Sequence, residues 1–181
     1  MLILEGADNL GKTTAAWKMM KIAKAKGVKN LGCHHMGRPD KSFNFCSDYG
    51  PMMGHSLIQD RFHLGALVWH DGVMNFPRLR AVEDRLATFN PLIIVFTADT
   101  ELFDYKATLD PGRELFDLDS IVKANGIYED ITRGHFALEE SPDFKVRVDD
   151  HYVMRHETDF PDDDQLEQWV DMWMEVKREA F

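Results

Sequence analysis

Short apolar runs of strand length alternate along the chain with longer stretches of helical periodicity. The clearest run, Leu-Ile-Ile-Val-Phe within residues 91–97, is apolar at every position, which is typical of a strand buried on both faces of a parallel sheet. Another short apolar strand opens the chain at residues 2–4. The same pattern predicts further strands at residues 31–36, 55–59 and 144–148.

Helical segments lie between these strands. The first runs from about Lys12 to Ala25 and ends before Gly27, because glycine commonly follows the last turn of a helix. The pattern places others from about residue 62 and at residues 77–89, 117–136 and 161–178, and it predicts a helix or lid at 99–109. In the last helix one face is apolar and carries Leu166, Trp169, Val170 and Trp173.

This alternation predicts an α/β fold, a three-layer sandwich in which helices cover both faces of a central five-stranded parallel sheet. Nothing in the composition marks a linker or a repeat, so residues 1–181 are expected to form a single domain. In such folds ligands bind at the carboxyl ends of the strands.

A complete phosphate-binding motif follows the first strand. Residues 6–13 read Gly-Ala-Asp-Asn-Leu-Gly-Lys-Thr and lie between an apolar strand and an amphipathic helix, which is the context the motif requires. Gly6 and Gly11 allow the backbone to wrap around an anion, and the N–H groups of Asn9, Leu10 and the helix start then point at phosphate.

Side chains of the same loop complete the site. Lys12 would reach the β- and γ-phosphates, the Thr13 hydroxyl would bind Mg²⁺, and Thr14 would add a phosphate contact. The motif therefore predicts a nucleoside triphosphate and Mg²⁺ as cofactors, but it does not identify the group that accepts the phosphoryl.

Charge and cysteine content narrow the class of protein. Twenty-one basic and thirty-one acidic residues give a net charge of -10, which argues against a general nucleic-acid binder. Residues 149–181 hold eleven acidic and three basic side chains, whereas residues 1–61 hold five acidic and nine basic ones. The acidity therefore belongs to the C-terminal part and does not count against phosphate chemistry near the loop.

Two cysteines cannot build a disulfide framework, and no apolar run reaches the ~20 residues of a membrane span. We therefore expect a cytoplasmic protein without a membrane partner. Cys33, His34, His35 and Cys46 lack zinc-ligand spacing, and adjacent histidines on a strand point to opposite faces, so the sequence argues against a zinc site.

Three segments resemble the thymidylate kinases and related nucleoside and nucleotide kinases. Residues 5–14, Glu-Gly-Ala-Asp-Asn-Leu-Gly-Lys-Thr-Thr, are similar to the opening of that family. Asp60-Arg61-Phe62 resembles its Asp-Arg-Tyr/Phe segment, and residues 92–99 are similar to its fourth strand and the turn toward a lid. The resemblance implies a P-loop kinase fold with a helical lid at about residues 104–116 and, as in many relatives, a homodimer.

The resemblance also implies roles for individual residues. Asp8 would approach the sugar 3′-hydroxyl of the acceptor, and Asp60 would lie near Mg²⁺ or its waters. Arg61 would lie near the acceptor phosphate, together with Arg38, which stands where the family has an Arg-Glu-Pro-Gly segment that is not intact here. Arg113, the one arginine of the expected lid, would cover the transferring phosphoryl group.

Glu5 does not decide which group accepts the phosphoryl. A glutamate at this place acts as the base in deoxynucleoside kinases, and thymidylate kinases can carry it too. Residues 63–70 lack the polar positions expected around a thymine base. The resemblance as a whole implies an enzyme that transfers the γ-phosphoryl of ATP to a deoxynucleoside monophosphate, with catalytic candidates Lys12, Asp60, Arg61, Arg113 and Glu5.

Two alternatives remain. A kinase of a hydroxyl acceptor would phosphorylate a deoxynucleoside or a hydroxymethylated pyrimidine in DNA, although the net charge makes DNA the less favoured acceptor. A regulatory NTPase would have no acceptor, but Asp60-Arg61 and the lid-like segment favour transfer.

Overall fold

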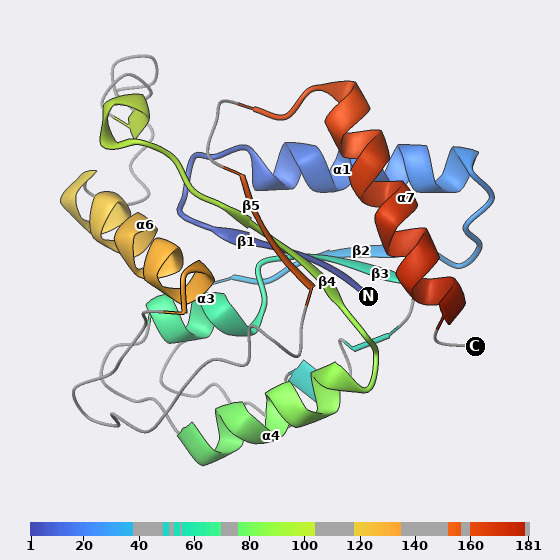
Figure 1. Ribbon diagram of the computed structural model, residues 1–181, viewed down its shortest axis with the longest axis horizontal. Coiled ribbons are helices and arrows are strands. Elements are labelled where there is room, and N and C mark those ends of the chain that lie inside the picture. The colour runs from blue at the N-terminus through green and yellow to red at the C-terminus, as the bar shows by residue number, and fades with distance from the viewer. Residues whose placement is uncertain are drawn as a thin grey trace.

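A computed structural model describes residues 1–37, 49–50, 53–54, 56–69, 76–103, 118–134, 152–156 and 160–179, and of β5 the backbone alone. Its strands are β1 (Leu2–Gly6), β2 (Gly32–His35), β3 (Leu57–Asp60), β4 (Leu92–Phe96) and β5 (Tyr152–His156). Its helices are α1 (Lys12–Ala25), α3 (His63–Val68), α4 (Phe76–Ala87), α6 (Leu118–Thr132) and α7 (Asp163–Glu179). Figure 1 shows how these elements are arranged.

The strands form one parallel sheet in the order β2-β3-β1-β4-β5. β1 lies in the middle, where Leu2 pairs with Ile58 of β3 on one side and with Leu92 of β4 on the other. The expectation of an α/β fold with a parallel sheet is confirmed. Because all strands run in the same direction, their carboxyl ends meet at one edge, where the phosphate loop follows β1.

One strand of the sheet lies in a segment where the sequence pattern did not predict a strand. Residues 144–148 lie outside the described residues, and the strand that pairs with β4 is Tyr152–His156. The sequence Phe-Lys-Val-Arg-Val at 144–148 alternates apolar and charged residues, which is the stronger local strand signal. Pairing with β4 is a tertiary property, so it can select a segment of weaker local pattern.

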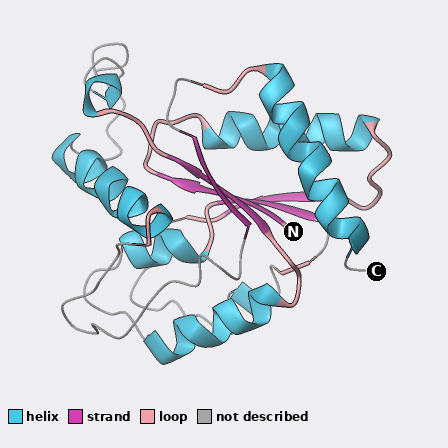
Figure 2. Ribbon diagram, viewed as in Figure 1, coloured by secondary structure: helices cyan, strands magenta, loops and turns pink. Residues whose placement is uncertain are grey.

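Alternate residues of the central strands pack into two separate hydrophobic cores, one on each face of the sheet. Leu2, Leu4 and Phe96 pack with α1 and α7 on one face, whereas Ile3 and Val95 pack with α3 and α4 on the other. The sheet consequently lies between two layers of helices, with the strands at the centre of Figure 2. Period-two alternation of side chains along a strand produces this division.

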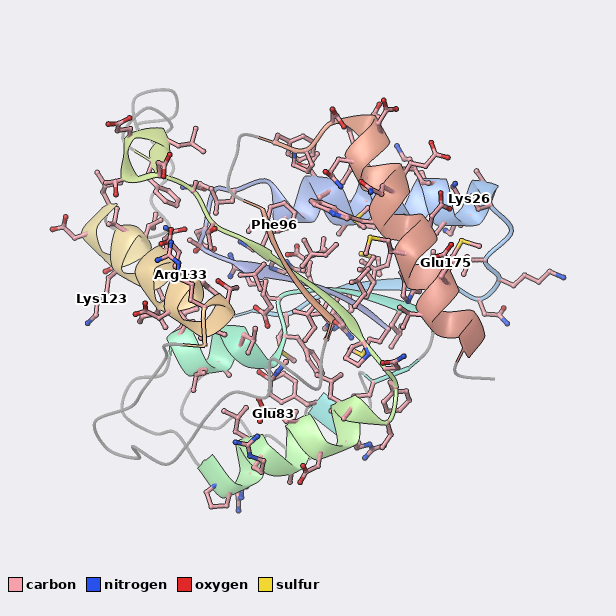
Figure 3. All side chains as sticks on the ribbon, viewed as in Figure 1. Lys26, Glu83, Phe96, Lys123, Arg133 and Glu175 are labelled. Atoms are coloured by element: carbon pink, nitrogen blue, oxygen red, sulfur yellow. The ribbon has the colours of Figure 1, made fainter. Side chains whose placement is uncertain are left out.

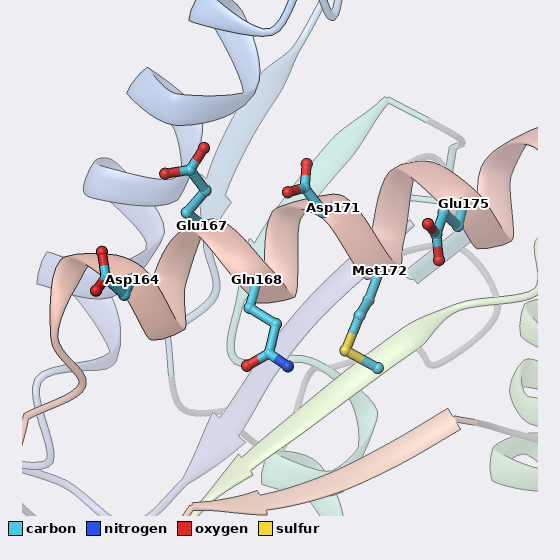
Figure 4. A pocket seen from close by; sticks show the side chains of 6 residues that line it. All are labelled: Asp164, Glu167, Gln168, Asp171, Met172 and Glu175. Carbon is cyan, nitrogen blue, oxygen red and sulfur yellow. The ribbon is translucent and has the colours of Figure 1, made fainter.

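Helix α7 packs on the sheet through the apolar face that was predicted from the sequence. Leu166, Trp169, Val170 and Trp173 are all buried, and the Trp169 ring meets Phe96 edge-on with 5.9 Å between centroids. Figure 3 shows Phe96 on the sheet side of this helix. The opposite face is acidic and borders a hollow of about 490 Å³, whose described lining residues are Asp164, Glu167, Gln168, Asp171, Met172 and Glu175 of α7 (Figure 4).

The expected lid is not part of the described structure. After β4 the chain is helical at residues 100–103, and the predicted lid at 104–116 lies outside the described residues. Within the described part of the chain, no helix combines the length and the apolar character that crossing a membrane requires.

Candidate active site

The phosphate loop is held in its shape by a glycine that touches the neighbouring strand. Gly6 has φ 131°, and a Cβ built on it would lie 2.2 Å from the Phe96 carbonyl oxygen. Only glycine fits such a position without moving the backbone of β4. Asn9 and Gly11 also have positive φ values, of 65° and 78°, so the loop curls before α1 begins at Lys12.

Lys12 lies buried inside this loop. Its ammonium group donates a hydrogen bond to the Ala7 carbonyl oxygen. Burial, reinforced by the charge of Arg61, lowers the pKa of Lys12 to about 8, while Asp8, Asp60 and Glu5 oppose the shift. Lys12 therefore lies close to Arg61, Asp8, Asp60 and Glu5, all of which were predicted from the sequence as site residues.

Asp60 is the buried carboxylate at the end of β3. Its Oδ2 atom accepts a hydrogen bond from the Thr13 hydroxyl at 2.5 Å and lies 2.7 Å from His35 Nδ1. Its Oδ1 atom is buried and has no partner among the described residues. Asp60 thus joins the start of α1 to the ends of β2 and β3 and retains one free oxygen.

The next residue, Arg61, connects the end of β3 to the phosphate loop. Arg61 has φ 69°, and its backbone N–H donates to the Leu4 carbonyl oxygen at 2.8 Å. Its guanidinium group forms an ion pair with Asp8 Oδ1. Asp8 is almost fully buried, and its Oδ2 atom has no partner among the described residues. This pair places a cation and a free carboxylate oxygen beside the loop.

Glu5 lies behind the loop and caps a helix. Its Oε1 atom accepts hydrogen bonds from the backbone N–H groups of Phe62 at 2.9 Å, Leu64 at 2.9 Å and Gly65 at 3.2 Å, at the start of α3. Its Oε2 atom accepts the Tyr128 hydroxyl of α6 at 3.3 Å. Both oxygens are consequently engaged in holding α3 and α6 against β1.

Burial dominates the ionisation of this glutamate. Glu5 has no exposed surface, and desolvation raises its pKa from 4.5 to about 7, although the three backbone donors and Lys12 oppose the shift. Burial and the nearby Glu5 also raise the pKa of Tyr128 well above 10, so its hydroxyl remains a donor.

The structure brings Asp8, Lys12, Thr13, Asp60 and Arg61 together at the carboxyl ends of β1 and β3. The exposed Thr14 follows Thr13 on α1, and Glu5 lies on the inner side of the loop. Leu10 of the loop is buried in the core between the sheet and α1. Two other predicted residues, Arg38 and Arg113, lie outside the described residues.

One residue of the site was missed by the sequence prediction. His35 ends β2 and contacts Asp60, with which it is paired in register. Its position at the carboxyl end of a predicted strand was a usable signal. From the sequence, this histidine was weighed only as a zinc ligand. Its contact with Asp60 on the neighbouring strand was therefore not predicted.

Thr13 and Asp60 fit a magnesium ion. Mg²⁺ prefers oxygen ligands, and it commonly binds through one or two protein oxygens, substrate phosphates and water. The Thr13 hydroxyl and the unpartnered Asp60 Oδ1 provide such oxygens. Among the described residues no group of three or more His, Cys, Asp or Glu side chains could hold a metal, so these two would need phosphate oxygens as co-ligands.

Comparison with known proteins adds evidence on the fold. No protein-family model matches the sequence, and a search of curated proteins gives no significant match. The crystal structure of the YorR protein from Bacillus subtilis in complex with phosphorylated GDP is similar, with a TM-score of 0.69 and 18% sequence identity. The match covers 98% of this chain and 97% of that one, so the chain has the overall fold of a solved nucleotide-bound protein.

Proposed function

We propose that the protein transfers the γ-phosphoryl group of ATP to the phosphate of a deoxynucleoside monophosphate, as the resemblance to thymidylate kinases implies. The observation that carries the proposal is the convergence of two distant segments: the phosphate loop with Lys12 and Thr13, and the end of β3 with Asp60 and Arg61. A phosphate loop alone would bind a triphosphate, whereas Arg61 adds a cation for a second, phosphate-bearing substrate and Asp60 adds an oxygen for Mg²⁺.

The charges of the site suit phosphoryl transfer. This reaction depends mainly on positioning and on neutralising phosphate charge, and the site holds two cations, Lys12 inside the loop and Arg61 paired with Asp8 of the loop. Mg²⁺ held by Thr13 and Asp60 would neutralise further charge on the phosphate oxygens. Asp8 would orient the acceptor, because its buried Oδ2 atom is free to accept a hydrogen bond from a sugar hydroxyl.

The state of Glu5 favours a phosphate as the acceptor. A phosphate oxygen is already ionised and needs no base, whereas a hydroxyl acceptor does. Glu5, the glutamate that would serve as the base, has both oxygens engaged by α3 and α6 and no exposed surface. Its contacts support a structural role behind the loop.

A kinase of a hydroxyl acceptor is the second candidate. The pKa of Glu5, raised by burial to about 7, is the value that suits a general base at neutral pH. For this chemistry the carboxylate would have to leave the three backbone donors of α3. The acceptor would then be a deoxynucleoside or a hydroxymethylated pyrimidine in DNA.

One labelling experiment tests these candidates. Protein, Mg²⁺ and ATP labelled in the γ-phosphate are incubated separately with nucleoside monophosphates, nucleosides and hydroxymethylated duplex DNA. Because the ligand of YorR is a guanine nucleotide, guanine monophosphates belong in the first pool. Label in the monophosphate pool is the expected result; label only in nucleosides or DNA would support the second candidate, and free phosphate without an acceptor would support an NTPase.

A variant pair ties the activity to the loop. Lys12→Ala should abolish label transfer while the protein stays folded, because the buried ammonium is lost from the phosphate site. Lys29→Ala removes an exposed lysine and should retain full transfer. Turnover that persists in Lys12→Ala would contradict the assignment of the phosphate loop.

A further inference from the structure

His35 and Asp60 are the last residues of two neighbouring parallel strands. They are paired in register across β2 and β3, which brings both side chains to the edge of the sheet where the phosphate loop lies. His35 Nδ1 is 2.7 Å from Asp60 Oδ2. The histidine side chain is 51% exposed and the aspartate 1%, so His35 covers a buried carboxylate from the solvent side.

Two donors fix the orientation of the Asp60 carboxylate. The Thr13 hydroxyl at the start of α1 and His35 Nδ1 at the end of β2 both bond to Oδ2. Because a carboxylate oxygen accepts, Nδ1 carries a hydrogen in this contact. Both donors use the same oxygen, and Oδ1 stays without a partner among the described residues.

We propose that His35 is a positioning residue that holds Asp60 Oδ2 and thereby keeps Oδ1 directed to the cation that accompanies the bound nucleotide. The proposal rests on the nucleotide-binding part of the proposed function. With His35 removed, Thr13 is the one remaining described donor to the carboxylate, and a single bond leaves the side chain free to turn about it. Donors behind a metal ligand typically change metal affinity 10- to 100-fold.

The position of His35 argues against a role in folding. A half-exposed side chain paired with a carboxylate contributes little to stability, since solvent screens the interaction. The same contact can still determine the geometry of the carboxylate. Loss of His35 should therefore change cation binding much more than it changes thermal stability.

Three variants separate these effects. His35→Ala removes the donor, and His35→Asn retains an N–H donor at about the same distance from the backbone. His34→Ala is the matched control, because His34 is the preceding strand residue, is exposed and is paired in register with Gln59. Thermal unfolding of all three is expected to stay close to that of the unaltered protein.

The measurement is the affinity for Mn²⁺, followed by electron paramagnetic resonance with a non-hydrolysable ATP analogue present. His35→Ala should weaken Mn²⁺ binding about 10-fold or more while the affinity for the analogue without metal is unchanged. His35→Asn should recover most of the loss, and His34→Ala should bind as the unaltered protein does.

Unchanged Mn²⁺ affinity in His35→Ala, an equal loss in His34→Ala, or an unaltered protein that binds no Mn²⁺ would each overturn the proposal. The measurement needs no acceptor, so a protein that binds the manganese nucleotide but phosphorylates nothing would contradict the proposed transfer reaction, while the variants would still decide the role of His35.

Discussion

At the scale of single residues, Glu5 couples stability to pH. Its pKa is raised by burial to about 7, whereas in the unfolded chain it returns to 4.5. Between these values the folded state holds a proton that the unfolded state has lost, so the contribution is complete below pH 4.5 and is lost as pH rises through 7. The loss amounts to about 3 kcal/mol of unfolding free energy.

Glu5→Gln should remove this dependence, because the amide does not ionise and still offers an oxygen to the α3 donors. Of the charged groups near Glu5, Lys12 keeps its proton below its pKa of about 8, and the Tyr128 hydroxyl is neutral throughout. Urea unfolding at pH 5 and pH 7 gives the comparison, with exposed Glu101→Gln as the control. Parallel pH curves for the Glu5 variant and the unaltered protein would contradict the prediction.

Gly6 gives a second prediction at this scale. In Gly6→Ala the new Cβ would meet the Phe96 carbonyl oxygen at 2.2 Å, and φ 131° is strained for any side chain. We expect a loss of about 3 kcal/mol or more in unfolding free energy. Gly126→Ala, in the open middle of α6, should instead gain about 0.5–1 kcal/mol. A Gly6 variant as stable as the Gly126 variant would exclude this close approach.

Local and distant contacts explain which site residues could be predicted. Gly6, Lys12 and Thr13 belong to one contiguous motif, so the sequence alone places them together in the loop. The contact of His35 with Asp60 depends on the register of two strands that are twenty-five residues apart, which no local pattern encodes. The engagement of Glu5 by α3 and α6 likewise appears only when the helices are packed.

At the scale of elements, α7 is held to the sheet by its apolar face and only weakly by its ion pairs. Trp173 is fully buried. Lys26, directly after α1, forms ion pairs with Glu167 and Asp171 of α7 at the surface. Trp173→Ala should lower the unfolding free energy by about 3–5 kcal/mol. Lys26→Gln should have a much smaller effect that decreases further with added salt.

Urea unfolding at low and high salt checks the two variants of this layer. Similar losses of unfolding free energy in Trp173→Ala and Lys26→Gln would contradict the prediction and show that the ion pairs hold α7 to the sheet. Trp169, one turn earlier on the same buried face, offers an independent repeat of the Trp173 measurement.

The elements themselves were largely predictable where the chain has a single strong local signal. The limits of α1 agree with the prediction because the phosphate motif fixes its start and Gly27 follows its end. Helix α7 was recognised from its apolar face and from the acidic residues at its start. The strand at Tyr152–His156 was not predicted, because its pairing with β4 depends on the whole sheet and not on its own local pattern.

At the scale of the whole molecule, charge is separated between the two ends of the chain. The loop and α1 come from the first sixty-one residues, which hold nine basic and five acidic side chains, while α7 presents Asp164, Glu167, Asp171 and Glu175. Helices α1 and α7 cover the same face of the sheet (Figure 1), so an extended polyanion bound along α1 would meet the acidic surface of α7. A small nucleotide at the loop avoids that surface.

This arrangement predicts that unmodified duplex DNA does not bind the protein. At about 0.15 M salt the fluorescence anisotropy of a labelled duplex should stay constant as protein is added, because a net charge of -10 repels the phosphate backbone. Binding of ATP by the same preparation, measured by calorimetry, shows that the protein is active. An anisotropy increase that weakens steeply with salt would indicate several contacts with DNA phosphates. That result would favour DNA over a free nucleotide as the acceptor.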